Sequence, residues 1–100
     1  MKNRPFRSSK LKMSAKDQMC SMNVVDVCNY DPSTTVLAHI NTELAGMGSK
    51  VDDFSACFCC SDCHVWLDQN KGSEEDMLFY TRRALVRTWK FWINNDYFKL

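Results

Sequence analysis

Four cysteines fall within seven residues of this 100-residue chain, in the stretch Cys-Phe-Cys-Cys-Ser-Asp-Cys that runs from 57 to 63. Two more, Cys20 and Cys28, lie upstream. Cysteines packed this closely along a chain pair with poor disulfide geometry. We therefore expect metal binding, which also suits a small domain, because a structural ion adds folding free energy to a modest core.

The amino terminus favours free thiols. Its first sixteen residues carry the positive charge of a signal peptide, but no apolar stretch follows them. No run of 18 apolar residues occurs that would cross a membrane. We expect an intracellular protein whose compartment keeps thiols reduced, so a secreted protein with three disulfides is the disfavoured alternative.

The spacing of Cys60 and Cys63 is typical of a zinc knuckle. The two form a C-x-x-C motif at the start of a predicted helix, where both thiolates can reach one ion. A tetrahedral site needs two further ligands, and Cys20 and Cys28 are the upstream pair, although their seven-residue gap is wider than in a standard knuckle. The sequence therefore predicts a zinc site made of these four cysteines.

Other residues compete for the same ion. Side chains two apart on a strand point the same way, so Cys57 and Cys59 would share one face and Cys60 would take the other. Both remain alternative ligands, or they are small buried hydrophobes, which is the usual fate of a free cysteine. His64, directly after the knuckle, is a further alternative ligand in place of one cysteine.

Composition and local signals predict one small α+β domain. Apolar residues make up 45% and charged residues 25% of the chain, as is usual for a globular protein. We expect a helical turn over 10–19, strands over 34–40 and 54–59, a short helix over 62–70 capped by Ser61, and loops over 20–33 and 41–52.

A long helix should follow Ser73, because acidic residues fill the next turn and resemble a capping box. One face of this helix carries a recurring apolar set that we expect in the core: Leu78, Leu85, Trp89 and Trp92. Another face carries Arg83, Arg87 and Lys90. Such a basic stripe is more often a solvated face than a DNA contact.

Charge is unevenly distributed along the chain. Residues 1–16 carry six basic side chains and no acid, while the remaining residues sum to −5, giving the net charge of +1. We predict a flexible basic arm over 1–9 followed by a single zinc-containing domain over 10–100. The segment is either a solvated terminus or a phosphate-binding region, and the residues predicted to bind nucleic acid are Lys2, Arg4, Arg7, Lys10 and Lys12.

The chain has only two histidines, and both occupy informative positions. His39 lies near the end of the first predicted strand, and His64 lies in the first turn of the helix anchored by the knuckle. A single histidine is more often structural than catalytic. A strand–strand–helix unit would nevertheless bring these two to one site, which gives the pair more weight.

A strand ending in histidine, then a loop, then C-x-x-C-H opening a helix, resembles the HNH or ββα-metal nucleases. More specifically, the chain is similar to the YbcO-like nuclease family of prophages from about residue 10 to its end. The residues that carry the resemblance are Val27-Cys28-Asn29, Asp31-Pro32, the segment 34–40, Gly46-Met47-Gly48, Lys50, Asp53, Ala56, the segment 60–64, Val86-Arg87-Thr88 and Trp92.

The resemblance implies a small treble-clef-like ββα-metal fold with a structural zinc and a carboxy-terminal helix. It implies a DNA endonuclease encoded by a phage or prophage and located in the cytoplasm of the bacterial host. His39 would be the general base, because an imidazole titrates near neutral pH. His64 would hold a catalytic Mg²⁺ or Mn²⁺ that neutralises phosphate charge, with Asp53 as the nearest carboxylate.

Two departures from the HNH pattern keep a second hypothesis open. Ala38 stands where an acidic metal ligand often precedes the base, and Phe54-Ser55-Ala56 fills the place of the middle asparagine. The alternative is a non-catalytic zinc-binding treble-clef module that binds DNA or a partner protein. The nuclease hypothesis requires His39 and His64 to converge on an accessible cleft, whereas the module does not. Under both we expect DNA but neither a membrane nor a small-molecule cofactor, and a homodimer would suit cutting of both strands.

Overall fold

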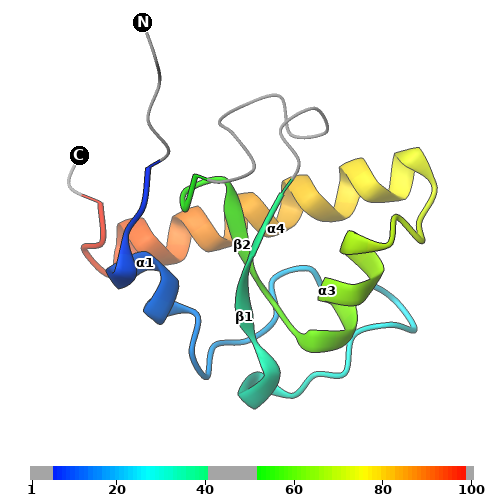
Figure 1. Ribbon diagram of the computed structural model, residues 1–100, viewed down its shortest axis with the longest axis horizontal. Helices are drawn as coiled ribbons and strands as arrows, with labels where there is room; N and C mark the ends of the chain where they lie inside the picture. The colour runs from blue at the N-terminus through cyan, green and yellow to red at the C-terminus, as the bar shows by residue number, and fades with distance from the viewer. Residues whose placement is uncertain (1–5, 41–51, 99–100) are drawn as a thin grey trace, which may run out of the picture.

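The computed structural model describes residues 6–40 and 52–98, and the structural statements below refer to these. The elements are α1 (Ser9–Ser14), a 3-10 turn η1 (Pro32–Thr34), β1 (Val36–His39), β2 (Ala56–Cys59), α3 (Ser61–Asp68) and α4 (Glu74–Asn94). The two strands form a central hairpin, with α4 passing behind it and α1 and α3 flanking it on either side (Figure 1). The α+β class is therefore confirmed.

The hairpin is antiparallel and shorter than predicted. Val36 lies opposite Cys59 and His39 opposite Ala56. The first strand begins two residues later than expected because Asp31 and Pro32 start a 3-10 turn, in which the Asp31 carboxylate accepts a hydrogen bond from the Ser33 amide at 3.0 Å. All four residues of β2 are buried, so this strand forms the centre of the domain.

The two helices after the hairpin begin with different caps. Cys60, and not Ser61 as predicted, is the N-cap of α3, because its sulfur accepts the Cys63 amide at 3.4 Å. Cys60 therefore lies directly after the end of β2 and directly before the start of α3. The predicted cap of α4 is confirmed, since the Ser73 hydroxyl accepts the Asp76 amide at 3.1 Å.

The buried face of α4 includes two threonines. Thr81 donates to the Met77 carbonyl at 2.6 Å, and Thr88 accepts the Phe58 amide at 3.1 Å, so both hydroxyls are satisfied inside the core. Leu85 and Trp92 are buried as predicted, and Trp89 is half-buried. The prediction that Leu78 belongs to the core face is wrong: it is only half-buried and borders a surface groove.

Two apolar clusters hold these layers together. The larger surrounds Cys57 and Cys59 of β2 and reaches α3 and α4. The smaller joins α1 to Phe58 and Trp92, and the Trp92 indole donates to the Ser14 hydroxyl at 2.7 Å. None of the described helices has the length and apolarity needed to cross a membrane.

Candidate metal centre and histidine–aspartate hollow

Four cysteines gather at one end of the hairpin. The sulfur atoms of Cys20, Cys28, Cys60 and Cys63 all lie within 4.8 Å of one another, and three of these residues are buried. Within residues 6–40 and 52–98, no other group of three or more His, Cys, Asp or Glu side chains is placed to hold an ion. Thiolates 2.3 Å from a tetrahedral zinc lie about 3.8 Å apart, and the Cys28 and Cys60 sulfurs are 3.8 Å apart.

The loop between the first two cysteines is shaped by Asn23. Its amide donates to the Cys20 sulfur and its side chain donates to the Cys28 sulfur, both at 3.5 Å. Asn23 has a φ of 47°, a left-handed conformation that asparagine tolerates better than most residues. These two hydrogen bonds stabilise the thiolates, so the wide gap between the cysteines is closed by a specific turn.

Two arginines of α4 fix the same loop from outside. Arg83 donates to the Met22 carbonyl at 2.7 Å, and Arg87 donates to the Ser21 carbonyl at 3.2 Å and to the Asn23 side chain at 3.0 Å. Their interpretation as a solvated face therefore missed a structural role. Their spacing of four residues placed them on one helix face, but nothing local in the sequence indicated which carbonyls they would meet.

The thiols of this end are electrostatically unequal. Hydrogen bonds from the Cys59 and Cys63 thiols hold the pKa of Cys20 far below its usual range. The same contacts with Cys20 raise the pKa of Cys59 and of Cys63, and burial raises the pKa of Cys28. Cys59 therefore supports the Cys20 thiolate as a neighbouring donor, although it lies outside the group of four.

At the other end of the hairpin, His39 and Asp53 form a hydrogen-bonded pair. The His39 Nε2 and Asp53 Oδ1 atoms are 2.9 Å apart, with the carboxylate 5% and the imidazole 26% exposed. Burial alone would raise the pKa of Asp53, but the Ser8 amide, the His39 ring and the Arg7 charge together lower it. An ionised carboxylate only accepts hydrogen bonds, so Nε2 of His39 carries the hydrogen and Nδ1 is the basic nitrogen.

The segment before α1 is tied to this pair. The Asp53 Oδ2 atom accepts the Ser8 amide at 2.6 Å, and Asp52 accepts the Phe6 amide at 2.7 Å. The Phe6 ring packs on Phe54 with a centroid distance of 5.7 Å. Phe6 and Ser8, which lie within the predicted arm, therefore contact the folded domain. The rest of that arm, with Lys2 and Arg4, lies outside the described residues.

A hollow of about 350 Å³ opens beside the pair, lined by Arg7, Ser8, Ser9, Lys12, His39 and Asp53. Two of the residues predicted to bind nucleic acid, Arg7 and Lys12, thus lie beside the His39–Asp53 pair. Lys10 instead lies over the Tyr97 ring, with its Nζ atom 5.1 Å from the ring centre. The hollow brings together one imidazole, one carboxylate and two cations.

His64 is not part of this hollow. Its Nε2 atom lies 3.2 Å from an oxygen of Asp68, one turn further along α3. The lining of the hollow includes His39 and Asp53 but not His64. Among the residues that the structure describes, the expected convergence of the two histidines is therefore not seen.

Comparison with known proteins gives one consistent family. A family model described as "Putative nuclease YbcO" matches residues 9–97. Relatives of that description from Escherichia coli K12 and Enterobacteria phage 82 are each 42% identical over 60 residues, which cover 59% of this chain. The chain spans 62% of the length of these curated relatives.

A solved structure shares the fold. It is described as a "putative bacteriophage protein" from Escherichia coli K-12 MG1655, and it superposes with a TM-score of 0.72 at 26% identity, covering 85% of this chain and 98% of its own. The family match runs from the start of α1 past the end of α4. The chain therefore belongs to the family described as "Putative nuclease YbcO", as its sequence predicts.

Proposed function

We propose that the protein is a DNA endonuclease that hydrolyses phosphodiester bonds in the hollow beside His39. The observation that carries the proposal is the His39–Asp53 hydrogen bond of 2.9 Å at the edge of an open hollow that also holds Arg7 and Lys12. The two histidines do not converge as the nuclease hypothesis required, so the proposal rests on His39 with Asp53 and not on His64. Family membership supports a nuclease-like function independently of this geometry.

His39 acts as the general base in this proposal. With Nε2 donating to Asp53, Nδ1 accepts a proton from a water molecule as its oxygen attacks phosphorus. The phosphorus–oxygen bond opposite the attacking water breaks, and the departing alkoxide takes a proton from solvent. The imidazolium that forms is stabilised by the ionised Asp53 carboxylate, and the same bond holds the ring in orientation. The Ser8 amide in turn fixes Asp53, so the base is supported by a chain of two hydrogen bonds.

Arg7 and Lys12 supply positive charge for the substrate. Both line the hollow, and guanidinium and ammonium groups bind phosphate oxygens through charge-assisted hydrogen bonds. Charge that develops on the phosphate during hydrolysis would be stabilised most by groups already in place. Arg7 is in place because Phe6 and Ser8, on either side of it, are both bonded to the turn before β2.

The two metals that the resemblance implies fit this chain to different degrees. Four cysteine sulfurs within 4.8 Å of one another suit a structural zinc, and they would be the ligands of the treble clef that the resemblance implies. A catalytic Mg²⁺ or Mn²⁺, which would neutralise phosphate charge, fits less well. Asp53 is the carboxylate that lines the hollow, and its two oxygens already contact the His39 ring and the Ser8 amide. His64, paired with Asp68 outside the hollow, gains no support from the structure as a ligand of that ion.

The test is cleavage of supercoiled plasmid by zinc-loaded protein, with and without added Mg²⁺ or Mn²⁺. We expect His39→Ala to reduce nicking by about 10²-fold or more while circular dichroism shows an unchanged fold. His64→Ala, which removes the other histidine, should nick normally. A loss in His64→Ala would instead restore the metal-ligand role that the resemblance implies.

Nicking that survives His39→Ala would contradict the proposal and would indicate a contaminating nuclease. Absence of nicking in the wild type, with DNA binding retained, would favour the non-catalytic zinc-binding module. Chelation by EDTA is a poor single control, since it would remove the structural ion together with the catalytic one. The decisive comparison is therefore the nicking activity of His39→Ala and His64→Ala against that of the wild type.

A further inference from the structure

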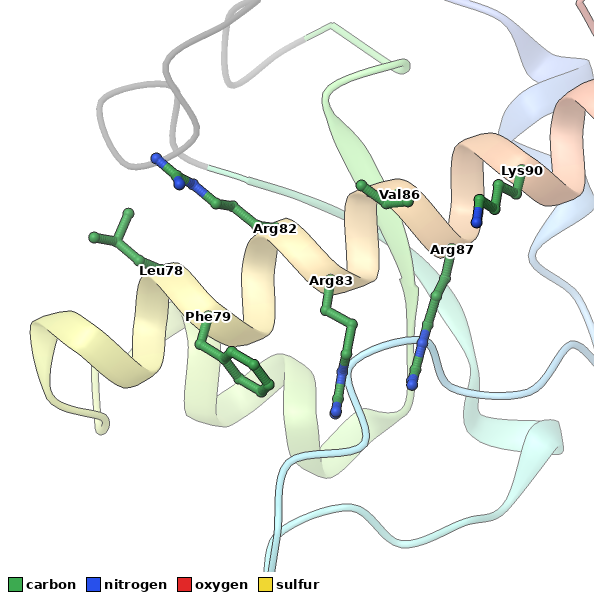
Figure 2. Close-up of a pocket in the computed structure, with 7 residues that line it drawn as sticks. All are labelled: Leu78, Phe79, Arg82, Arg83, Val86, Arg87 and Lys90. Atoms are coloured by element: carbon green, nitrogen blue, oxygen red, sulfur yellow. The ribbon is translucent and has the colours of Figure 1, made fainter.

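A second concave surface lies on the outer face of α4 and shares no residue with the hollow. It is a groove of about 590 Å³, and Figure 2 shows the side chains that border it. Leu78, Phe79 and Val86 supply its apolar part. The basic side chains are those of Arg82, Arg83, Arg87 and Lys90, and no acidic side chain lines it.

The apolar part of this groove is unusually open to solvent. Phe79 is 56% and Val86 47% exposed, and Ile93, one heptad further on, is 39% exposed. Residues seven apart lie on one side of a helix, so these three form a stripe along the side of α4 that the core does not use. Grouped exposed apolar side chains of this kind mark binding surfaces more often than scattered ones do.

The positive charges of the groove are partly fixed in position. Arg83 and Arg87 are held by the loop carbonyls that they bond, and the Arg83 guanidinium lies 5.1 Å from the centre of the Phe79 ring. Arg82 extends to the other side of the helix axis (Figure 2). Arg82 and Lys90 are eight residues apart, which is about 12 Å along a helix. Positively charged side chains are therefore distributed along the groove.

We propose that this groove binds a single-stranded nucleic acid, with a base stacked on Phe79 and the phosphates running past Arg82 towards Lys90. Surfaces that bind single strands combine a positive groove with an exposed aromatic ring, and this groove has both. A duplex offers its phosphates but keeps its bases stacked inside. The proposal rests on the proposed function, for which the groove would hold a strand at a distance from the hollow.

Two other occupants of the groove, a second copy of the chain and an acidic polypeptide, fit it less well. A second copy of the chain would bring the same four cations against each other across the groove, which disfavours an isologous contact. An acidic polypeptide would match the charge but would leave the exposed Phe79 ring without a stacking partner. These alternatives are included below as outcomes of the test.

The experiment measures binding of fluorescein-labelled oligo(dT) of fifteen nucleotides to the full-length zinc-loaded protein, without added Mg²⁺. We expect Phe79→Leu, which keeps an apolar side chain, to weaken binding about tenfold, whereas Phe79→Tyr should bind normally. The double variant Arg82→Ala/Lys90→Ala should reduce the slope of log K against log salt by about 1.4. A matched control, Lys16→Ala/Lys71→Ala, removes two charges elsewhere and should leave both values unchanged.

Equal weakening by the groove and control variants would overturn the proposal, because it would show attraction by total charge alone. Tighter binding of duplex than of oligo(dT), or an unchanged affinity in Phe79→Leu, would also overturn it. Displacement by poly-glutamate at lower charge concentration than by oligo(dT) would assign the groove to an acidic polypeptide instead. Plasmid nicking is measured separately: oligo(dT) binding without nicking removes the proposed function alone, and nicking without groove-dependent binding removes this inference alone.

Discussion

The two ends of the β1–β2 hairpin differ in how exposed they are and in which side chains they bring together. At the Cys59 end, the sulfurs of a four-cysteine group are close together, and Cys60 and Cys63 are fully buried. At the His39 end, an imidazole remains 26% exposed beside an open hollow. Strands rise about 3.3 Å per residue, so only about 10 Å of hairpin separates a closed centre from an open one. A closed cysteine group and an open histidine–aspartate hollow thus lie at opposite ends of one short element.

The largest effect is expected from disrupting the four-cysteine group at the Cys59 end of the hairpin. Cys60→Ser or Cys63→Ser should destabilise the domain by several kcal/mol, because a structural zinc contributes its binding free energy to folding. Urea unfolding and zinc content per chain measure this. Cys57→Ala is the matched control, since Cys57 is equally buried but lies outside the group of four. Equal loss of zinc in the control would contradict the ligand assignment.

The next effect tests whether the ends are independent. His39→Ala should lower the free energy of unfolding by about 1–3 kcal/mol, because the nearly buried Asp53 carboxylate loses one of its hydrogen-bond partners. Zinc content should not change. Unfolding on the scale of the cysteine variants would show that His39 is part of the structural core, and the division between the two ends would fail.

Asp53→Asn should alter how stability depends on pH. The pKa of Asp53 is lower in the folded protein, so its contribution to stability is present at neutral pH and is lost as the pH falls through the folded pKa. The difference in stability between wild type and variant should therefore shrink below about pH 4. Urea unfolding from pH 3 to 7 measures this difference. Protonation of the cysteines affects the stability of both proteins equally, so it does not contribute to the difference between them. A difference that stays constant with pH would exclude an ionised Asp53.

The smallest effect concerns the rim of the hollow. Arg7→Ala/Lys12→Ala should reduce the salt dependence of duplex DNA binding, by about 1.8 in the slope of log K against log salt. Lys10→Ala is the control, because Lys10 lies over Tyr97 and not in the hollow. Point variants are preferable to deletion of residues 1–9, which would also remove the hydrogen bonds of Phe6 and Ser8. An unchanged slope would remove these cations from the proposed site.

Local signals predicted the closed end well. The C-x-x-C of Cys60 and Cys63 has a fixed spacing, and the structure brings Cys20 and Cys28 to it as the sequence predicted. The Ser73 cap and the hairpin were also predictable, because capping and strand preference depend on neighbouring residues. The prediction for Leu78 was wrong because it used only the spacing of apolar residues along the helix. That spacing could not distinguish the core face of α4 from the adjacent face that borders the groove.

The open end depends on contacts that have no local signature. Asp53 meets Ser8 across 45 residues and His39 across 14, and nothing near Asp53 in the sequence indicates either partner. The adjacent acids Asp52 and Asp53 were a weak signal, equally typical of a surface turn. His64 illustrates the opposite error, since the motif that placed it beside the knuckle did not determine which way it would face.

The bracing of the cysteine loop by α4 also has a consequence for synthesis. Residues 21–23 are secured by Arg83, Arg87 and Thr88, which follow them by 61 to 67 positions in the chain. Because a polypeptide emerges from the ribosome amino terminus first, Cys20 and Cys28 are made well before these supports. The four-cysteine group can therefore be braced as it is in the folded domain only after α4 has been translated.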